Sequence, residues 1–70
     1  MQENDTLTVN GELHSYTSGM TIASLLEEIM DTPGVVVVEL NGTIIPRDLF
    51  VKTLLSADDT LEIVRFVGGG

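Results

Sequence analysis

Residues 35–46 read VVVVELNGTIIP, and this stretch decides the fold. Its first six residues are mostly β-branched and apolar toward both faces, and the run is too short for a helix, so it predicts an interior strand. Asn41-Gly42 is typical of a two-residue hairpin turn, because both central positions of a type I′ turn need positive φ. The next strand is expected over Thr43–Ile45. Pro46 ends it or confines it to a sheet edge, since proline has no N–H to donate to the ladder.

A second Asn-Gly pair predicts another hairpin near the N-terminus. Residues 6–9 alternate between polar and apolar side chains, as a half-buried strand does, and Asn10-Gly11 follows directly. The partner strand is expected over residues 13–17, and Ser18-Gly19 interrupts the strand pattern after it.

The segment after this hairpin has the period of a helix. We expect Thr21 to be the N-cap, residues 27–28 to face solvent, and the sequence DTPG at residues 31–34 to end the helix. The apolar stripe of the helix consists of Ile22, Leu25, Leu26 and Ile29. Met20 and Met30 bracket the helix and are expected to fill the core.

The C-terminal third supplies one more strand. Residues 47–55 predict a short helical turn and a crossing loop, SADD at residues 56–59 predicts a turn, and TLEIVRFV at residues 60–67 predicts a strand. Because two hairpins flank one helix, the last strand has to lie between them. The expected fold is α+β, a ubiquitin-like β-grasp with a mixed sheet of about five strands and one main helix packed on one face. We expect this domain to cover residues 1–67 and a flexible glycine tail to cover residues 68–70.

Alternation along the last strand divides its side chains between two faces. Leu61 and Ile63 are expected to point toward the helix. The opposite face carries Glu62, Val64 and Phe66. Since one helix cannot cover both faces, this second face is a candidate contact patch, unless its apolar residues pack under residues 47–55. Glu62 either meets a basic partner there or is an ordinary surface acid.

Composition narrows the class of partner. The 70 residues carry a net charge of −8, which disfavours nucleic-acid backbones and anionic membranes and favours a partner with a basic face. No run reaches about 18 apolar residues, and the polar, acidic N-terminus is unlike a signal peptide. The chain has no cysteine for a disulfide or a thiolate zinc site, and its single histidine cannot form a metal cluster. We expect a cytoplasmic protein.

Few side chains suggest catalysis. His14, on an expected edge strand, has no nucleophile or acid beside it in a recognisable motif and is interpreted as a solvated strand residue. Asp58-Asp59 resembles a carboxylate pair for acid-base chemistry, but Ser56 and Thr60 around it favour a turn. Arg47 either pairs with a carboxylate of the same domain or contacts a partner. We assign no catalytic residue and no metal ligand.

The sequence ends in Gly68-Gly69-Gly70, directly after the last predicted strand. Glycine has no Cβ, so such a tail can enter a narrow site on another protein and present its carboxylate there. The alternative interpretation is a frayed chain end or a cloning remnant.

Three features together resemble the thiamine-biosynthesis sulfur carrier family, ThiS. They are the β-grasp order, the segment LNGTIIPR at residues 40–47, and the ending LEIVRFVGGG at residues 61–70. The resemblance runs from Leu7 to Gly70. It implies that an E1-like adenylyltransferase activates the Gly70 carboxylate with ATP, that a sulfur donor system fed by a cysteine desulfurase makes a thiocarboxylate, and that thiazole synthase receives the sulfur. Gly68 and Gly69 would give the tail access.

The resemblance also implies what the chain itself does not do. A carrier is a protein substrate and not an enzyme, binds no cofactor of its own, and is expected to be a monomer when free. Two alternatives stay open. One is the sulfur carrier of molybdopterin synthesis, which shares the fold and the terminal glycines; the other is a ubiquitin-like adaptor that binds partners only through Val64 and Phe66.

Overall fold

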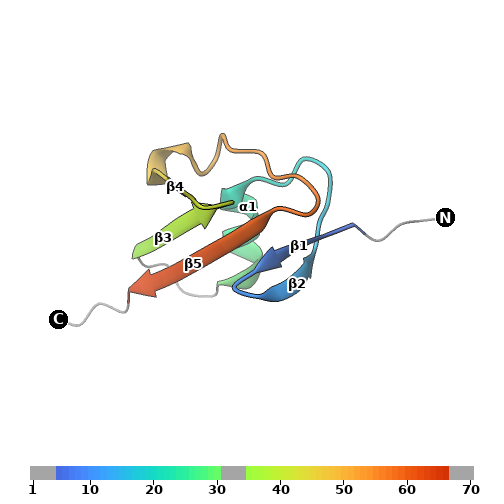
Figure 1. Ribbon diagram of the computed structural model, residues 1–70. Helices are drawn as coiled ribbons and strands as arrows, with labels where there is room; N and C mark the ends of the chain where they lie inside the picture. Colours follow the sequence, from blue (N-terminus) through green and yellow to red (C-terminus); the bar gives the residue numbers. More distant parts are fainter. Residues whose placement is uncertain (1–4, 31–34, 67–70) are drawn as a thin grey trace.

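The computed structural model in Figure 1 describes residues 5–30 and 35–66. Its elements, in chain order, are β1 (Thr6–Val9), β2 (Glu12–Ser15), α1 (Ile22–Ile29), β3 (Val35–Leu40), β4 (Thr43–Ile45), the 3-10 helix η1 (Arg47–Leu49) and β5 (Thr60–Phe66). Every predicted element is present. The second strand is shorter than the expected residues 13–17, and the predicted stop at residues 31–34 lies outside the described residues.

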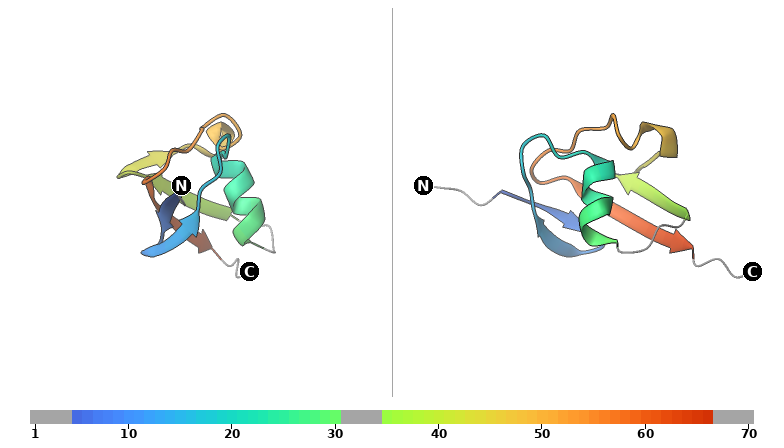
Figure 2. Two further views of the ribbon diagram at one scale, coloured as in Figure 1. Left: turned by 90° about the vertical axis from the view of Figure 1, so that its right-hand side faces the viewer. Right: turned by 180° about the vertical axis from the view of Figure 1, so that it is seen from behind.

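The five strands form one mixed sheet in the order β2-β1-β5-β3-β4. β5 is parallel to β1 and antiparallel to β3, and the two hairpin pairs are antiparallel. The last strand therefore lies between the two hairpins, as predicted. α1 lies across one face of the sheet and leaves the other face uncovered, which Figure 2 shows from the side and from behind. This is the expected β-grasp arrangement.

Both Asn-Gly pairs form the predicted turns. Asn10 and Gly11 have φ values of 51° and 85°, and Asn41 and Gly42 have 51° and 88°. Positive φ at both central positions matches the right-handed twist of the flanking strands. These turns fix the register of each hairpin, so they also fix which side chains face the helix.

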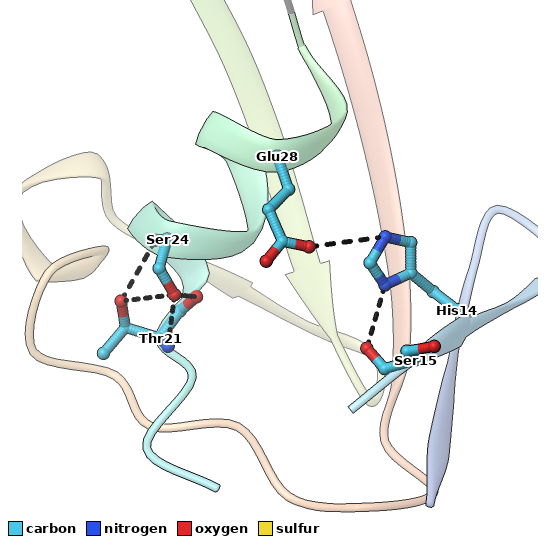
Figure 3. A network of polar contacts seen from close by, with 5 residues as sticks. All are labelled: His14, Ser15, Thr21, Ser24 and Glu28. Carbon is cyan, nitrogen blue, oxygen red and sulfur yellow. Dashed lines mark hydrogen bonds and ion pairs between the residues drawn. The ribbon is translucent and has the colours of Figure 1, made fainter. Parts of the chain in front are cut away.

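α1 begins at the predicted cap. The side chain of Thr21 accepts from the backbone N–H of Ser24 at 3.1 Å, and the Ser24 hydroxyl oxygen accepts from the backbone N–H of Thr21 at 2.9 Å (Figure 3). This reciprocal capping box satisfies two amide donors that a helix start leaves open. Ile22 and Leu25 are fully buried on the apolar stripe.

The core lies between α1 and the sheet and includes residues from the segment that follows η1. Its buried members are Leu7, Met20, Ile22, Leu25, Val38, Phe50, Leu55, Leu61 and Ile63. The segment around Phe50 packs against the start of α1, where Ala23 N–H donates to the carbonyl of Phe50 at 3.1 Å and Ile22 N–H to that of Thr53 at 3.2 Å. Residues 47–55 therefore close the end of the core at the helix start and do not pack over Val64 and Phe66.

Candidate functional site: the outer sheet face and the end of β5

The outer sheet face is the surface that α1 leaves uncovered. On β5, Leu61 and Ile63 are buried toward the helix, while Val64 and Phe66 are 53% and 55% exposed. The predicted division of side chains between the two faces is confirmed. Because no helix or loop among the described residues buries these two side chains, they are available for contact.

Strand β3 extends this surface. In the antiparallel pair, Val37 lies opposite Val64 and Val35 lies opposite Phe66, so the four side chains share one face. Val35 is 58% exposed. We call these four residues, Val35, Val37, Val64 and Phe66, the apolar patch. The sequence reasoning identified only its β5 half, although the four successive valines, apolar toward both faces, already indicated that alternate valines of β3 would lie on the outer side.

An acidic pair borders the apolar patch. Glu39 on β3 lies directly opposite Glu62 on β5, and Ile44 on β4 lies opposite Glu39. Like charges at directly opposed positions repel one another. A cationic side chain placed between the two carboxylates relieves that repulsion, so this position favours a partner arginine or lysine. Glu39 is a residue that the sequence reasoning missed.

Arg47 lies outside this surface, at the first position of η1. Its side chain is exposed. Within residues 5–30 and 35–66, the ion pair found inside 4.0 Å joins His14 and Glu28. No carboxylate of these residues lies within that distance of the Arg47 guanidinium. The structure thus gives Arg47 no carboxylate partner in the described part of the domain, and its contact with another protein stays a prediction.

His14 differs from the expectation of a solvated residue. It lies on edge strand β2, as predicted, but it is paired with buried Leu7 across the hairpin and therefore points to the helix side. Its side chain is 27% exposed, and its Nε2 lies 3.8 Å from Oε1 of Glu28 (Figure 3). The hairpin register explains the difference, because it places His14 inward and Leu13 outward.

The two adjacent aspartates form a turn, as the sequence indicated. Asp58 has a φ of 72°, and the carboxylate of Asp59 accepts from the Ser56 N–H at 2.7 Å and from Nδ2 of Asn41 at 3.0 Å. These contacts engage both oxygens of Asp59 in structural bonds. Among the described residues, no group of three or more His, Cys, Asp or Glu side chains is placed to hold a metal ion.

A side chain from the first hairpin turn binds the main chain of β5 at Ile63, in the middle of the strand. The Ile63 N–H donates to Oδ1 of Asn10 at 2.7 Å, and Nδ2 of Asn10 donates to the Ile63 carbonyl at 3.1 Å. β5 then continues to Phe66. The predicted tail residues Gly68, Gly69 and Gly70 lie outside the described residues.

Neither helix in the described ranges is long and apolar enough to cross a membrane.

Comparisons with known proteins agree on the family. A model of the ThiS family matches residues 7–70. The crystal structure of a thiamine biosynthesis protein (ThiS) from Geobacter metallireducens superposes with a TM-score of 0.68 at 33% identity, over 93% of this chain and 99% of that one. The protein ycf40 of Pyropia yezoensis is 33% identical over 70 residues, which are 100% of this chain and 99% of that one.

A further relative is much longer. A thiazole synthase from Paramagnetospirillum magneticum is 38% identical over 64 residues, which are 91% of this chain but only 20% of that protein. The chain thus spans about a fifth of the length of this relative.

The fold and the uncovered sheet face define a ubiquitin-like β-grasp domain. Within that class, the chain belongs to the ThiS family.

Proposed function

We propose that this protein carries sulfur on the carboxylate of Gly70 and delivers it for formation of the thiamine thiazole ring. The observation that carries the proposal is the family match, which extends through residue 70 and so includes the three glycines beyond the central strand β5. An ordered strand at the middle of the sheet gives the tail a rigid base, and glycines give it a narrow profile.

The chemistry requires activation before sulfur can enter. A carboxylate is a poor electrophile, so an oxygen of Gly70 first attacks the α-phosphorus of ATP on an E1-like adenylyltransferase, and pyrophosphate leaves. Hydrosulfide, formed when a thiol reductant releases the persulfide sulfur of a donor system with a cysteine desulfurase, then attacks the acyl carbon and displaces AMP. The product is a thiocarboxylate. In this scheme the chain is a substrate that binds no cofactor, and ATP belongs to its partner.

The proposed acceptor is a thiazole synthase. The support is the relative from Paramagnetospirillum magneticum, in which a segment similar to this chain is part of a protein named thiazole synthase. A domain joined covalently to another protein acts on it at high effective concentration, and we expect the same contact to form between separate chains.

Partner enzymes are proposed to dock on the apolar patch and the acidic pair. The patch combines exposed Val64 and Phe66 with two valines of β3, and Glu39 and Glu62 favour a cation beside it. This arrangement is typical of an interface with an apolar centre and a charged border. The net charge of −8 would further steer a basic partner toward the chain.

Incubation of the protein with its adenylyltransferase, ATP and inorganic sulfide tests the proposal by intact mass. The expected product has one oxygen replaced by one sulfur at the last residue. A variant that lacks Gly70 should stay unmodified. Adding the thiocarboxylated protein to thiazole synthase or to the large subunit of molybdopterin synthase then identifies the pathway, since only the cognate enzyme turns over.

A further inference from the structure

In the part of the chain that the structure describes, the end of β5 pairs with a strand on one side only. All positions from Leu61 to Phe66 are paired with β3, whereas the pairing with β1 consists of Thr8 with Thr60 and Val9 with Leu61. Beyond Ile63, no strand among residues 5–30 and 35–66 continues the ladder on the β1 side. Figure 1 and Figure 2 show β5 extending past the end of β1.

The direction of the backbone groups identifies the open position. On the β1 side, the carbonyls of Asp59 and Leu61 accept from Thr8 and Asn10, and the next odd residue, Ile63, bonds to the Asn10 side chain. Backbone groups of a strand alternate between its two neighbours. The N–H and C=O of Arg65 therefore point to the same side, one step beyond the Asn10 side chain.

The ladder of hydrogen bonds between β1 and β5 ends at Asn10. Its side-chain amide offers a donor and an acceptor, as a backbone unit does, and so occupies the place of one more residue of β1. The following Gly11 turns the chain away into the hairpin with β2. Past this point, no described residue bonds to the main-chain groups of β5 that face this edge, and the neighbouring side chains of Val64 and Phe66 are exposed.

We propose that the edge of β5 at Arg65 binds an extended segment of thiazole synthase, which adds to the sheet in line with β1 beyond Asn10. The inference rests on the proposed function, because it concerns how the partner takes hold of the chain close to the carrying end. Main-chain bonds to Arg65 would fix the direction in which β5 leaves the domain, and an apolar side chain of the incoming segment would cover Val64 and Phe66. Thiazole synthase is the partner because a ThiS-like segment occurs within a protein of that name.

Comparing a proline with a valine at position 65 separates the contribution of the Arg65 N–H to binding from that of its side chain. Arg65→Pro removes the N–H that faces the open edge together with the charged side chain and also restricts φ, and proline is tolerated where the missing donor is not part of a ladder. Arg65→Val keeps that N–H and removes the charge. We expect Arg65→Pro to weaken binding to purified thiazole synthase about tenfold. The Arg65→Val variant should bind with an affinity within about twofold of that of the original sequence. Titration calorimetry without ATP or sulfide measures both.

Amide hydrogen exchange gives a second readout on the unaltered sequence. The Arg65 amide should exchange rapidly in the free protein and become protected in the complex, which also decides the matter if Arg65→Pro fails to fold. Equal binding by the two variants, equal loss in both, or an unprotected Arg65 amide in the complex would overturn the inference. Absence of any complex would overturn it too, while the thiocarboxylation assay would still test the carrier function separately.

Discussion

Asn10 and Ile63 are joined by two hydrogen bonds across 53 positions of sequence, of 2.7 Å and 3.1 Å. The side chain of a hairpin turn thereby binds the main chain of the last strand, just before that strand leaves the support of β1. The turn of the second hairpin also binds β5 through its asparagine, because Oδ1 of Asn41 accepts from the Thr60 N–H at 2.9 Å. The two turns thus hold β5 at two positions, from opposite sides.

Asn10→Gly should lower the free energy of unfolding by about 1–3 kcal/mol, because it removes two partly buried bonds while preserving the positive φ of the turn. Asn41→Gly is the matched control. It loses bonds that are exposed to solvent, so we expect a smaller effect. Chemical denaturation of both variants measures the difference, and a larger loss at Asn41 would contradict this account of β5.

The alternation along β5 predicts opposite results at neighbouring positions. Leu61→Ala should cost about 2–5 kcal/mol, because Leu61 is fully buried and its loss leaves a cavity in the core. Val64→Ala should cost less than about 1 kcal/mol, since its side chain lies on the uncovered face. Thermal unfolding compares the two, and similar losses would mean that Val64 is packed.

Charge on the apolar patch should prevent docking without unfolding the domain. Val64→Asp and Phe66→Asp are expected to weaken binding to the adenylyltransferase or to thiazole synthase at least tenfold, because an aspartate must be desolvated in an apolar contact. Leu13→Asp is the control, since Leu13 is 75% exposed on edge strand β2, away from the patch. Equal effects of all three substitutions on binding would show that the patch is not the contact.

The acidic pair should act in opposite directions on stability and on binding. Glu62→Gln removes the repulsion with Glu39 and should raise the free energy of unfolding by about half a kcal/mol. The same change should weaken the partner complex and flatten its dependence on salt, because one attractive charge is lost. Denaturation and binding titrations at two ionic strengths measure both, and a complex of unchanged affinity would leave Glu62 as an ordinary surface acid.

Local patterns predicted most of the fold. The Asn-Gly pairs, the helical stripe with Thr21 as its cap, and the valine run each specify their structure through neighbouring residues, and all three are confirmed. The order of these elements left a single place for β5. The contribution of β5 to the outer face could also be predicted, because successive side chains of a strand point to opposite faces.

The features that the sequence did not reveal depend on distant partners. The bonds of Asn10 to Ile63 need the parallel pairing of β1 and β5, and the acidic pair needs the register of β3 against β5. His14 lies on the predicted edge strand, but its partial burial was not predicted, because the register of its hairpin decides which face it occupies. Predictions for Gly68, Gly69 and Gly70 rest on the family and on chemistry, since they lie outside the described residues.

The measurement that tests the central claim most directly is the intact mass of the protein after incubation with its adenylyltransferase, ATP and inorganic sulfide. The account predicts replacement of one oxygen by sulfur, located by fragmentation at Gly70, and no such change without ATP or in the variant that lacks Gly70. An unchanged mass with an active cognate enzyme, or the same modification after Gly70 is deleted, would contradict it.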